Sequence, residues 1–320
     1  MAPRISLIIP TQRRPEPLAR AARSTFVQAG VAWSDIELVV VDNDAVPSAK
    51  ILVERLAVEA PFPVVYVHEP QAGVASARNA AMARARGELI AFLDDDEEAS
   101  PGWLEALLEV HVRFDADVVF GPVRARAPGH VVEHRAYIER FFSRGGPEVA
   151  GPINLYYGCG DSLIRKAILP DPQHPFSMAR NHRGGEDDML FGQLSALGAR
   201  FAWAPQAWVW EDPAPERLNL DYTLRRAFAY GQGPVAQCAA QTPPNWPGVA
   251  RWTLIGAAQV VVYGVAALIQ MLLRRPDRAF MMDRAMRGLG KIFWGGPFTI
   301  QFYGLPATPA APPERRRAPI

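Results

Sequence analysis

Five consecutive acidic residues, Asp94 to Glu98, directly follow the uncharged run 89–93. Adjacent carboxylates repel one another, and because no Cys or His stands beside these five, they suit a hard, oxygen-seeking divalent cation such as Mg²⁺ or Mn²⁺. Such a cation would neutralise a diphosphate. The ordinary alternative is a solvated loop ahead of a helix. Three aspartates in a row, 94–96, are harder to explain in that way, and they predict a metal site.

A helix is expected to begin shortly after these acids. Ser100 and Pro101 have the residue types that are favoured at an N-cap and at the first helical position. A helix over 101–114 would therefore leave Glu97 and Glu98 just outside its first turn.

Glu186, Asp187 and Asp188 form a second acidic group, placed after the glycine pair 184–185. The glycines permit unusual backbone angles, and the acids then begin a helix that Gly198 ends. The ordinary explanation is that acids near a helix N-terminus complement its dipole. That explanation accounts for one acid better than for three, so this group is a second candidate for chemistry.

Strands and helices alternate regularly through the first 120 residues or so. This alternation predicts right-handed crossovers and a parallel sheet that is covered by helices. In such sheets ligands bind at the carboxyl ends of the strands, where both 42–44 and 94–96 would lie. The expected strands are 5–9, 36–41, 64–68, 89–93 and 117–120, and the expected helices are 15–29, 46–59, 74–86 and 101–114.

The loop before the third helix, 71–79, is rich in small residues around one basic side chain, Arg78. It lacks the glycine spacing of a dinucleotide-binding loop and the lysine of a Walker loop. Arg78 has two interpretations: an exposed arginine on the helix surface, or a clamp on a bound nucleotide.

Composition narrows the possible partners. The chain has 320 residues and a net charge of +1, so nothing draws it as a whole toward nucleic acid. Its two cysteines, Cys159 and Cys238, have no metal-binding or redox spacing, which indicates structural thiols in a reducing compartment. Residues 1–4 run directly into the first strand, so no secretory signal is expected.

The order of the motifs resembles that of family 2 glycosyltransferases of the GT-A fold, across residues 4–235. Each motif is weak alone, and the specificity lies in the series. The resemblance implies a mostly parallel, Rossmann-like α/β sheet with helices on both faces, a nucleotide-sugar donor, a Mn²⁺ or Mg²⁺ ion and inversion at the anomeric carbon. The motifs are Pro10-Thr11 with Arg13, the segment 40–44, the segment 73–79, the Asp triplet 94–96 and Gly185-Glu186-Asp187-Asp188.

The resemblance also implies roles by position. Asp187 is the candidate base that takes the proton from the acceptor hydroxyl, with Glu186 and Asp188 as alternatives. Asp94 and Asp96 are the expected metal ligands. Six residues are expected to contact the nucleotide: Thr11, Arg13, Asp42, Arg78, Asp94 and Asp95.

A third protein ligand for the metal is expected near a strand over 201–210. Many relatives have a histidine there, whereas this chain has Trp210-Glu211-Asp212. Glu211 is an oxygen donor suited to the same cation, and an ordinary surface acid at a strand end explains it about as well. Upstream, 154–160 is expected to form a strand and a turn near the site.

The C-terminal part raises the question of a membrane. After a helix expected over 220–230 and ended by Gly231, residues 253–273 carry no charge and are long enough to cross a bilayer. A buried core helix is the alternative. If 253–273 spans, the arginine-rich segment 274–291 lies outside the cell, contrary to the usual distribution of positive charge.

We therefore expect that 253–273 does not span alone. It either lies in the membrane interface or bends at Gly264 into a re-entrant pair, and both arrangements keep its basic flanks cytosolic. Residues 293–305 are too short to cross and would form a second interfacial piece. The Pro- and Ala-rich tail 306–320 is expected to be disordered, with Arg315–Arg317 attracted to anionic lipid.

These expectations combine into a domain plan and a function. Residues 1–240 form the catalytic domain, 241–305 a membrane-associated helical region and 306–320 a tail. The expected activity moves a sugar from a UDP-, GDP- or dTDP-sugar to a lipid-linked or polysaccharide acceptor, at the cytoplasmic face of the inner membrane. Two alternatives remain: a non-catalytic nucleotide-binding scaffold on the membrane, and a nucleotidyltransferase, although 10–14 has no glycine for a phosphate-gripping loop.

Overall fold

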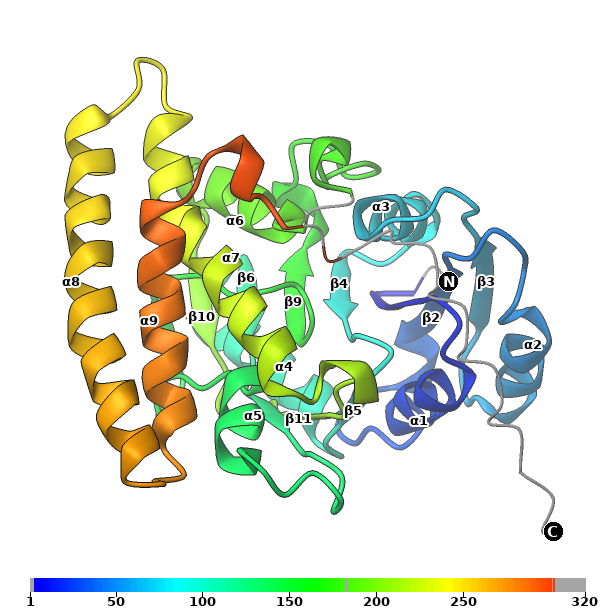
Figure 1. Cartoon of the computed structure of the whole chain (residues 1–320). Coiled ribbons are helices and arrows are strands. Elements are labelled where there is room, and N and C mark those ends of the chain that lie inside the picture. Colours follow the sequence, from blue (N-terminus) through cyan, green and yellow to red (C-terminus); the bar gives the residue numbers. More distant parts are fainter. Residues whose placement is uncertain (1–2, 182–183, 301, 303–320) are drawn as a thin grey trace, which may run out of the picture.

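The computed structural model describes residues 3–181, 184–300 and 302, and a mixed eight-stranded sheet forms its centre (Figure 1). One half consists of parallel strands: β1 (Ile5–Thr11), β2 (Ile36–Asp42), β3 (Val64–His68) and β4 (Leu89–Phe92). The other half contains β9 (Ser162–Arg165), β6 (Val118–Phe120), β10 (Phe201–Trp203) and β8 (Gly151–Ile153), and the order is β3-β2-β1-β4-β9-β6-β10-β8. β9 and β8 run antiparallel to their neighbours. The α/β prediction is confirmed.

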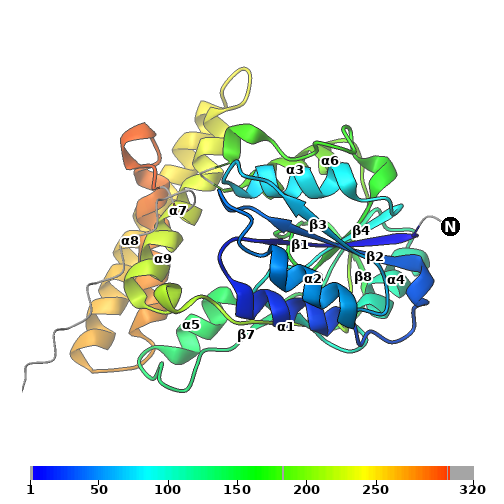
Figure 2. The same ribbon diagram turned by 90° about the vertical axis from the view of Figure 1, so that its right-hand side faces the viewer.

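Helices cover both faces of this sheet, as Figure 2 shows. One layer is α1 (Pro15–Thr25), α2 (Lys50–Glu59) and α4 (Trp103–Arg113), and the other is α3 (Val74–Arg84) and α6 (Glu186–Ala196). Leu7 and Val40 belong to the first core, whereas their neighbours Ile8 and Val39 belong to the second. Burial on both faces explains why β1, β2 and β4 are mostly apolar in the sequence. The polar residues in the interior of β1 and β2 are Ser6 and Glu37, and the Ser6 hydroxyl donates to Glu37 Oε1 at 2.7 Å.

A second, three-stranded sheet lies beside the acidic loop. β11 (Val209–Glu211) pairs antiparallel with β5 (Glu97–Ala99) and parallel with β7 (Val123–Ala125). The predicted helix start at Ser100 is therefore wrong, because the backbone is still leaving a strand there. α4 begins at Trp103 with Gly102 at its N-cap, and the N–H of Leu104 in its first turn donates to the side-chain oxygen of Gln28 at 3.0 Å.

Three other predicted boundaries are also wrong. The strand expected over 201–210 is two strands, because the chain passes there from the large sheet to the small one. The segment 154–160 contains no strand and instead connects β8 to β9. α2 begins at Lys50 rather than at 46, because the backbone N–H of Ala49 first donates to the Asp42 carboxylate at 2.7 Å.

Three long helices, α7 (Leu220–Ala239), α8 (Trp246–Leu272) and α9 (Arg278–Ile292), stand at one side of the sheet, next to the shorter α5 (Arg135–Phe142) (Figure 1). α7 does not end at Gly231 as predicted. A Cβ on Gly231 would overlap the carbonyl oxygen of Arg287, so this glycine lets α7 and α9 touch within a continuing helix.

The predictions for the C-terminal part are only partly right. α8 exists and is unbroken through Gly264, so a bend at that residue is wrong. α9 is absent from the predicted elements. The expected interfacial piece 293–305 has, in its described part, one 3₁₀ turn, Gly296–Phe298. Residues 301 and 303–320, which include the predicted tail, lie outside the described residues.

Candidate functional site

A cleft of about 670 Å³ opens at the carboxyl ends of β1 and β4. Thr11 comes from the end of β1, and Asp94 and Asp96 come from the loop after β4. Asp187 enters from the first turn of α6, and Glu211 from the end of β11. Segments that are more than 100 residues apart in the sequence therefore deliver their acids to one place.

The Asp triplet is tied to the loop after β1. Thr11 Oγ1 donates to Asp95 Oδ2 at 2.8 Å. The Arg14 guanidinium donates through one nitrogen to Asp95 Oδ1 at 2.9 Å and to Asp96 Oδ2 at 2.7 Å. Burial nevertheless raises the pKa of Asp95 to about 6, with Arg14 opposing that shift and Asp96 adding to it. The triplet thus carries more negative charge than its protein partners balance.

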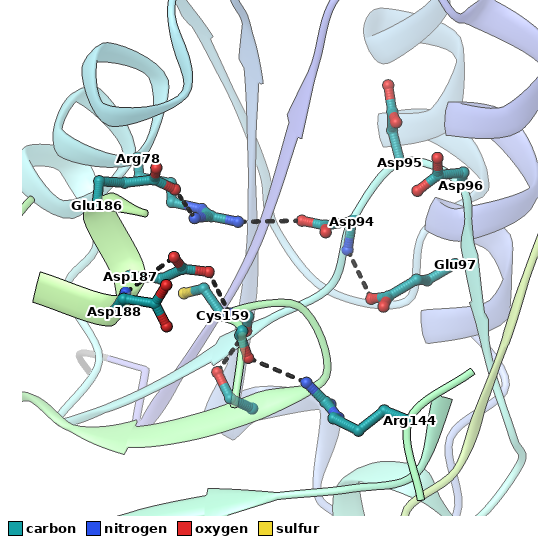
Figure 3. Close-up of polar contacts among 12 residues, drawn as sticks. Arg78, Asp94, Asp95, Asp96, Glu97, Arg144, Cys159, Glu186, Asp187 and Asp188 are labelled. Atoms are coloured by element: carbon teal, nitrogen blue, oxygen red, sulfur yellow. Dashed lines mark hydrogen bonds and ion pairs between the residues drawn. The ribbon is translucent and has the colours of Figure 1, made fainter. Parts of the chain in front are cut away.

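The side chain of Asp94 points toward Arg78, away from Asp95 and Asp96 (Figure 3). Its backbone N–H donates to Glu97 Oε2 at 2.9 Å, and its carboxylate is 3.5 Å from an Arg78 nitrogen. Burial raises its pKa, Arg78 opposes this, and Asp96 and Asp187 add to it. Gly160 lies against the same carboxylate, because a Cβ there would be 2.7 Å from Asp94 Oδ2. The glycine keeps the cleft open beside this acid.

Arg78 is buried, so its interpretation as an exposed surface arginine is wrong. Its guanidinium donates to Glu186, and the two side chains are 6% and 4% exposed. Burial raises the pKa of Glu186 to about 7, while Arg78 opposes that rise. Arg78 therefore lines the cleft and joins α3, α6 and the loop that carries Asp94.

Asp187 is held by backbone groups and faces the cleft. Its Oδ2 accepts from the N–H of Cys159 at 3.2 Å, and its Oδ1 accepts from the N–H of Asp188 at 2.9 Å. Gly185, with φ of +83°, turns the chain into α6 immediately before these acids. Asp188 itself is exposed and is not among the described residues that line the cleft.

Glu211 reaches the cleft through strand pairing. It lies opposite Glu97 in the register of β11 and β5, and the N–H of Asp212 donates to the carbonyl oxygen of Asp96 at 2.9 Å. Burial, followed by the carboxylates of Asp96 and Asp94, raises the pKa of Glu211 well above its usual value. Glu211 is thus a neighbour of the triplet rather than an isolated surface acid.

Two residues that were expected beside the nucleotide face elsewhere. Arg13 forms an ion pair with Asp44 at 2.7 Å, and Asp42 accepts from Ala49 and, at 2.9 Å, from the hydroxyl of Tyr66. Neither Arg13 nor Asp42 is among the described residues that line the cleft. They hold the loop between β2 and α2, while Asn43 of that loop lines the cleft.

Arg144 is a cleft residue that the sequence reasoning missed. Its guanidinium donates to the carbonyl oxygens of Gly121, Gly158 and Asp161 at 2.9, 3.0 and 2.8 Å. It therefore fixes the loop that carries the Cys159 N–H to Asp187. A single arginine in an irregular segment gives no periodic signal, so the sequence alone offered nothing that singled it out.

The rest of the cleft wall is aromatic and basic. Phe141 and Phe142 come from α5, and Tyr222, Arg226 and Tyr230 come from α7. The ring of Phe142 stacks on that of Tyr222, with centroids 6.4 Å apart. The cleft thus combines an acidic side with a side suited to sugar rings and anions.

The donor set suits a hard divalent cation, although the acids are not gathered around one point. Among the described residues, no group of three or more His, Cys, Asp or Glu is arranged to hold a metal ion. The residue types nevertheless fit, because Asp94, Asp96 and Glu211 are oxygen donors in one cleft whose mutual repulsion a cation would relieve. In this structure the Arg14 guanidinium provides the positive charge at Asp96.

Sequence comparison gives this chain clear relatives. The family model described as glycosyl transferase family 2 matches residues 6–171. The succinoglycan biosynthesis protein ExoM of Rhizobium meliloti is 37% identical over 229 residues, which are 71% of this chain and 73% of that protein. The minor teichoic acid biosynthesis protein GgaB of Bacillus subtilis is 26% identical over 204 residues, 63% of this chain and 22% of that protein.

Solved structures share the fold. The mannosyltransferase PcManGT from Pyrobaculum calidifontis, in complex with GDP-Man and Mn²⁺, has a TM-score of 0.56 and 18% identity, covering 92% of this chain and 88% of that chain. Residues 1–349 of S. aureus TarS, in complex with UDP, have a TM-score of 0.53 and 18% identity, covering 90% and 89%. At 18% identity the likeness shows that the fold is shared and nothing more.

Proposed function

This chain belongs to glycosyl transferase family 2, and from that premise we propose that it moves a sugar from a nucleotide-sugar donor to an acceptor hydroxyl, with inversion at the anomeric carbon. One observation carries the proposal: the acids from the loop after β4, from α6 and from β11 line one cleft at the carboxyl edge of the sheet. This is the edge where open α/β sheets bind ligands. The nucleotide would lie against four residues of this cleft, Thr11, Arg78, Asp94 and Asp95. Arg13 and Asp42 would position the loop between β2 and α2 without contacting the nucleotide.

Asp187 is the base in this proposal. It lines the cleft, and its carboxylate accepts two hydrogen bonds from backbone N–H groups. Glu186 instead accepts from Arg78, and Asp188 is exposed. The acceptor oxygen attacks the anomeric carbon, and its proton passes to the Asp187 carboxylate. The bond from the anomeric carbon to the diphosphate oxygen breaks, and its electron pair leaves with the nucleoside diphosphate.

Asp94, Asp96 and Glu211 would hold the divalent cation, Mn²⁺ or Mg²⁺. When bound, the cation supplies positive charge that stabilises the departing diphosphate. The raised pKa values of Asp94 and Glu211 support this assignment, because burial and then neighbouring carboxylates both disfavour their charged forms, and a cation would offset both effects. Arg14, which pairs with Asp96 in this structure, would compete with the cation for that carboxylate.

The donor is a UDP-, GDP- or dTDP-sugar, and the acceptor is a lipid-linked or growing polysaccharide. Structural neighbours in complex with UDP and with GDP-Man support the donor class. Relatives named for succinoglycan and teichoic acid biosynthesis support the acceptor class. α8 supports association with a membrane, since it is the one described helix long and apolar enough to cross one, and we assign the enzyme to the cytoplasmic face of the inner membrane.

The test is nucleotide release from a panel of UDP-, GDP- and dTDP-sugars with Mn²⁺ and an acceptor extract, with and without EDTA. We expect release from one donor class, abolished by EDTA and reduced at least about 100-fold in Asp96→Asn. Nucleotide binding is measured in the same samples. Release that persists in EDTA would contradict the metal assignment, and the absence of nucleotide binding would overturn the proposed function.

A further inference from the structure

The outward face of α8 is apolar from Leu254 to Leu272, after the exposed Arg251 near the start of the helix. Its exposed residues recur every three or four positions, which is the spacing of one helix face. Over its most apolar 18 residues the mean hydropathy is 1.9 and 6% of the residues are buried. Soluble domains rarely leave so continuous an apolar surface in water. The exposed residues include Leu254, Val261, Val262, Val265, Leu268, Ile269 and Leu272.

The two glutamines of α8 have buried side-chain oxygens instead. Within the described part of the chain, the side-chain carbonyl oxygens of Gln259 and Gln270 are buried without a hydrogen-bond partner. Gln259 also lies against α9, because a Cβ on Gly288 would be 2.9 Å from its Cβ. A helix with polar residues inward and apolar residues outward has the reverse of the usual arrangement in water. It is suited to contact with hydrocarbon.

α9 determines how α8 can meet a bilayer. The two helices are in backbone contact, because a Cβ on Gly256 would be 2.7 Å from the carbonyl oxygen of Gly288. α9 is in turn fixed to the catalytic domain. Asp283 accepts from the Tyr137 hydroxyl of α5 at 3.3 Å, and Arg278 pairs with Glu133 at 2.7 Å. α8 therefore lies along the side of the domain, as Figure 1 shows.

A spanning α8 would take its neighbour into the hydrocarbon. α9 carries Asp283, Arg284, Arg287 and Lys291, and charged residues are strongly disfavoured at the bilayer centre. Basic residues also flank both ends of α8, with Arg251 near the start and Arg274-Arg275 just after the end. Charges of one sign at both ends match a surface that meets both ends at headgroup level.

We propose that α8 lies in the plane of an anionic membrane surface, with its apolar face in the outer hydrocarbon and with α9 and the catalytic domain on the cytoplasmic side. This inference rests on the membrane association proposed above and gives its mode. α7 connects that surface to the site: Tyr222 and Tyr230 line the cleft, and Gly231 packs against α9. An acceptor whose lipid remains in the bilayer would approach the cleft along α7.

The first experiment is flotation of the purified full chain with phosphatidylglycerol-containing vesicles and with phosphatidylcholine vesicles. The test variant is Val261→Glu with Leu268→Glu, and the matched control is Ile51→Glu with Val58→Glu, two exposed residues of α2 with the same spacing. We expect the wild type and the control to float with anionic vesicles. The vesicle-bound fraction of the test variant should be at least 10-fold smaller than that of the wild type.

Three results would overturn the inference. In the first, the wild type does not bind vesicles. In the second, the test variant binds them as well as the control does. In the third, the wild type is a dimer in buffer that the test variant dissociates, which would assign the face to a second copy. A phosphatase fused after Ile320 adds a topology test. We expect no phosphatase activity on the extracytoplasmic side of the membrane. Activity on that side would show that α8 spans the membrane and would overturn the inference. Nucleotide binding, measured alongside, separates these outcomes from a failure of the proposed chemistry.

Discussion

At the scale of single residues, Arg78 and Arg14 each join acids of the cleft. Arg78 was identifiable in the sequence as one basic side chain in a run of small residues. Arg14 was not, because it stands beside Arg13 and either arginine could face the cleft. The backbone decides between them: Arg13 has a φ of +57° and turns out to Asp44, which directs Arg14 to the Asp triplet. A sequence does not reveal such a turn in a non-glycine residue.

In the proposed function Arg14 and a divalent cation compete for Asp96, so removing the guanidinium should favour the cation. We predict that Arg14→Gln binds Mn²⁺ about 10-fold more tightly than the wild type without nucleotide, since an opposite charge in contact with a carboxylate has effects of this size. Free Mn²⁺, followed by electron paramagnetic resonance, gives the affinity.

The control for this prediction is Arg20→Gln. Arg20 also belongs to α1 and also pairs with acids, Glu98 at 3.0 Å and Asp212 at 3.1 Å, but it is not among the described residues of the cleft. Its loss should leave the Mn²⁺ affinity unchanged. An Arg14→Gln variant with unchanged or weaker Mn²⁺ binding would refute the competition.

At the scale of elements, the sequence predicted what is buried on two faces and missed what is short. β1, β2 and β4 are mostly apolar because helices cover both sides. β5 and β11 have three residues each, and their pairing brings Glu211 to the triplet. No periodicity can be detected over three residues, so the sequence suggested Glu211 only through its resemblance to a family position.

The glycines between α7 and α9 act at this scale too. A Cβ on Gly290 would overlap the carbonyl oxygen of Phe228, whereas a Cβ on Gly264 of α8 would have nothing within 4 Å. We predict that Gly290→Ala lowers the free energy of unfolding by about 1–3 kcal/mol, because the helices must separate. Gly264→Ala should raise it by about 0.5–1 kcal/mol, because alanine favours the helix. Thermal unfolding in matched detergent measures both, and equal effects of the two variants would argue against close packing of α7 and α9.

At the scale of the whole molecule, one helix serves two regions. α7 lines the cleft with Tyr222, Arg226 and Tyr230, and it packs on α9, which carries α8. The sequence showed the apolar stretch of α8 but not α9, whose charges and glycines follow no simple amphipathic pattern. The relation of the catalytic cleft to the apolar surface therefore came only from the folded structure.

In the proposed function Asp187 accepts the proton of the acceptor hydroxyl. Comparing Asp187→Asn with Asp188→Asn tests this role directly. The two residues are adjacent acids of α6, and only Asp187 is among the described residues of the cleft. With the active donor and its acceptor, we predict that Asp187→Asn lowers kcat at least about 100-fold while nucleotide affinity stays within a few-fold. Asp188→Asn should retain most activity. A fully active Asp187→Asn enzyme, or equal losses of activity in the two variants, would show that Asp187 is not the base.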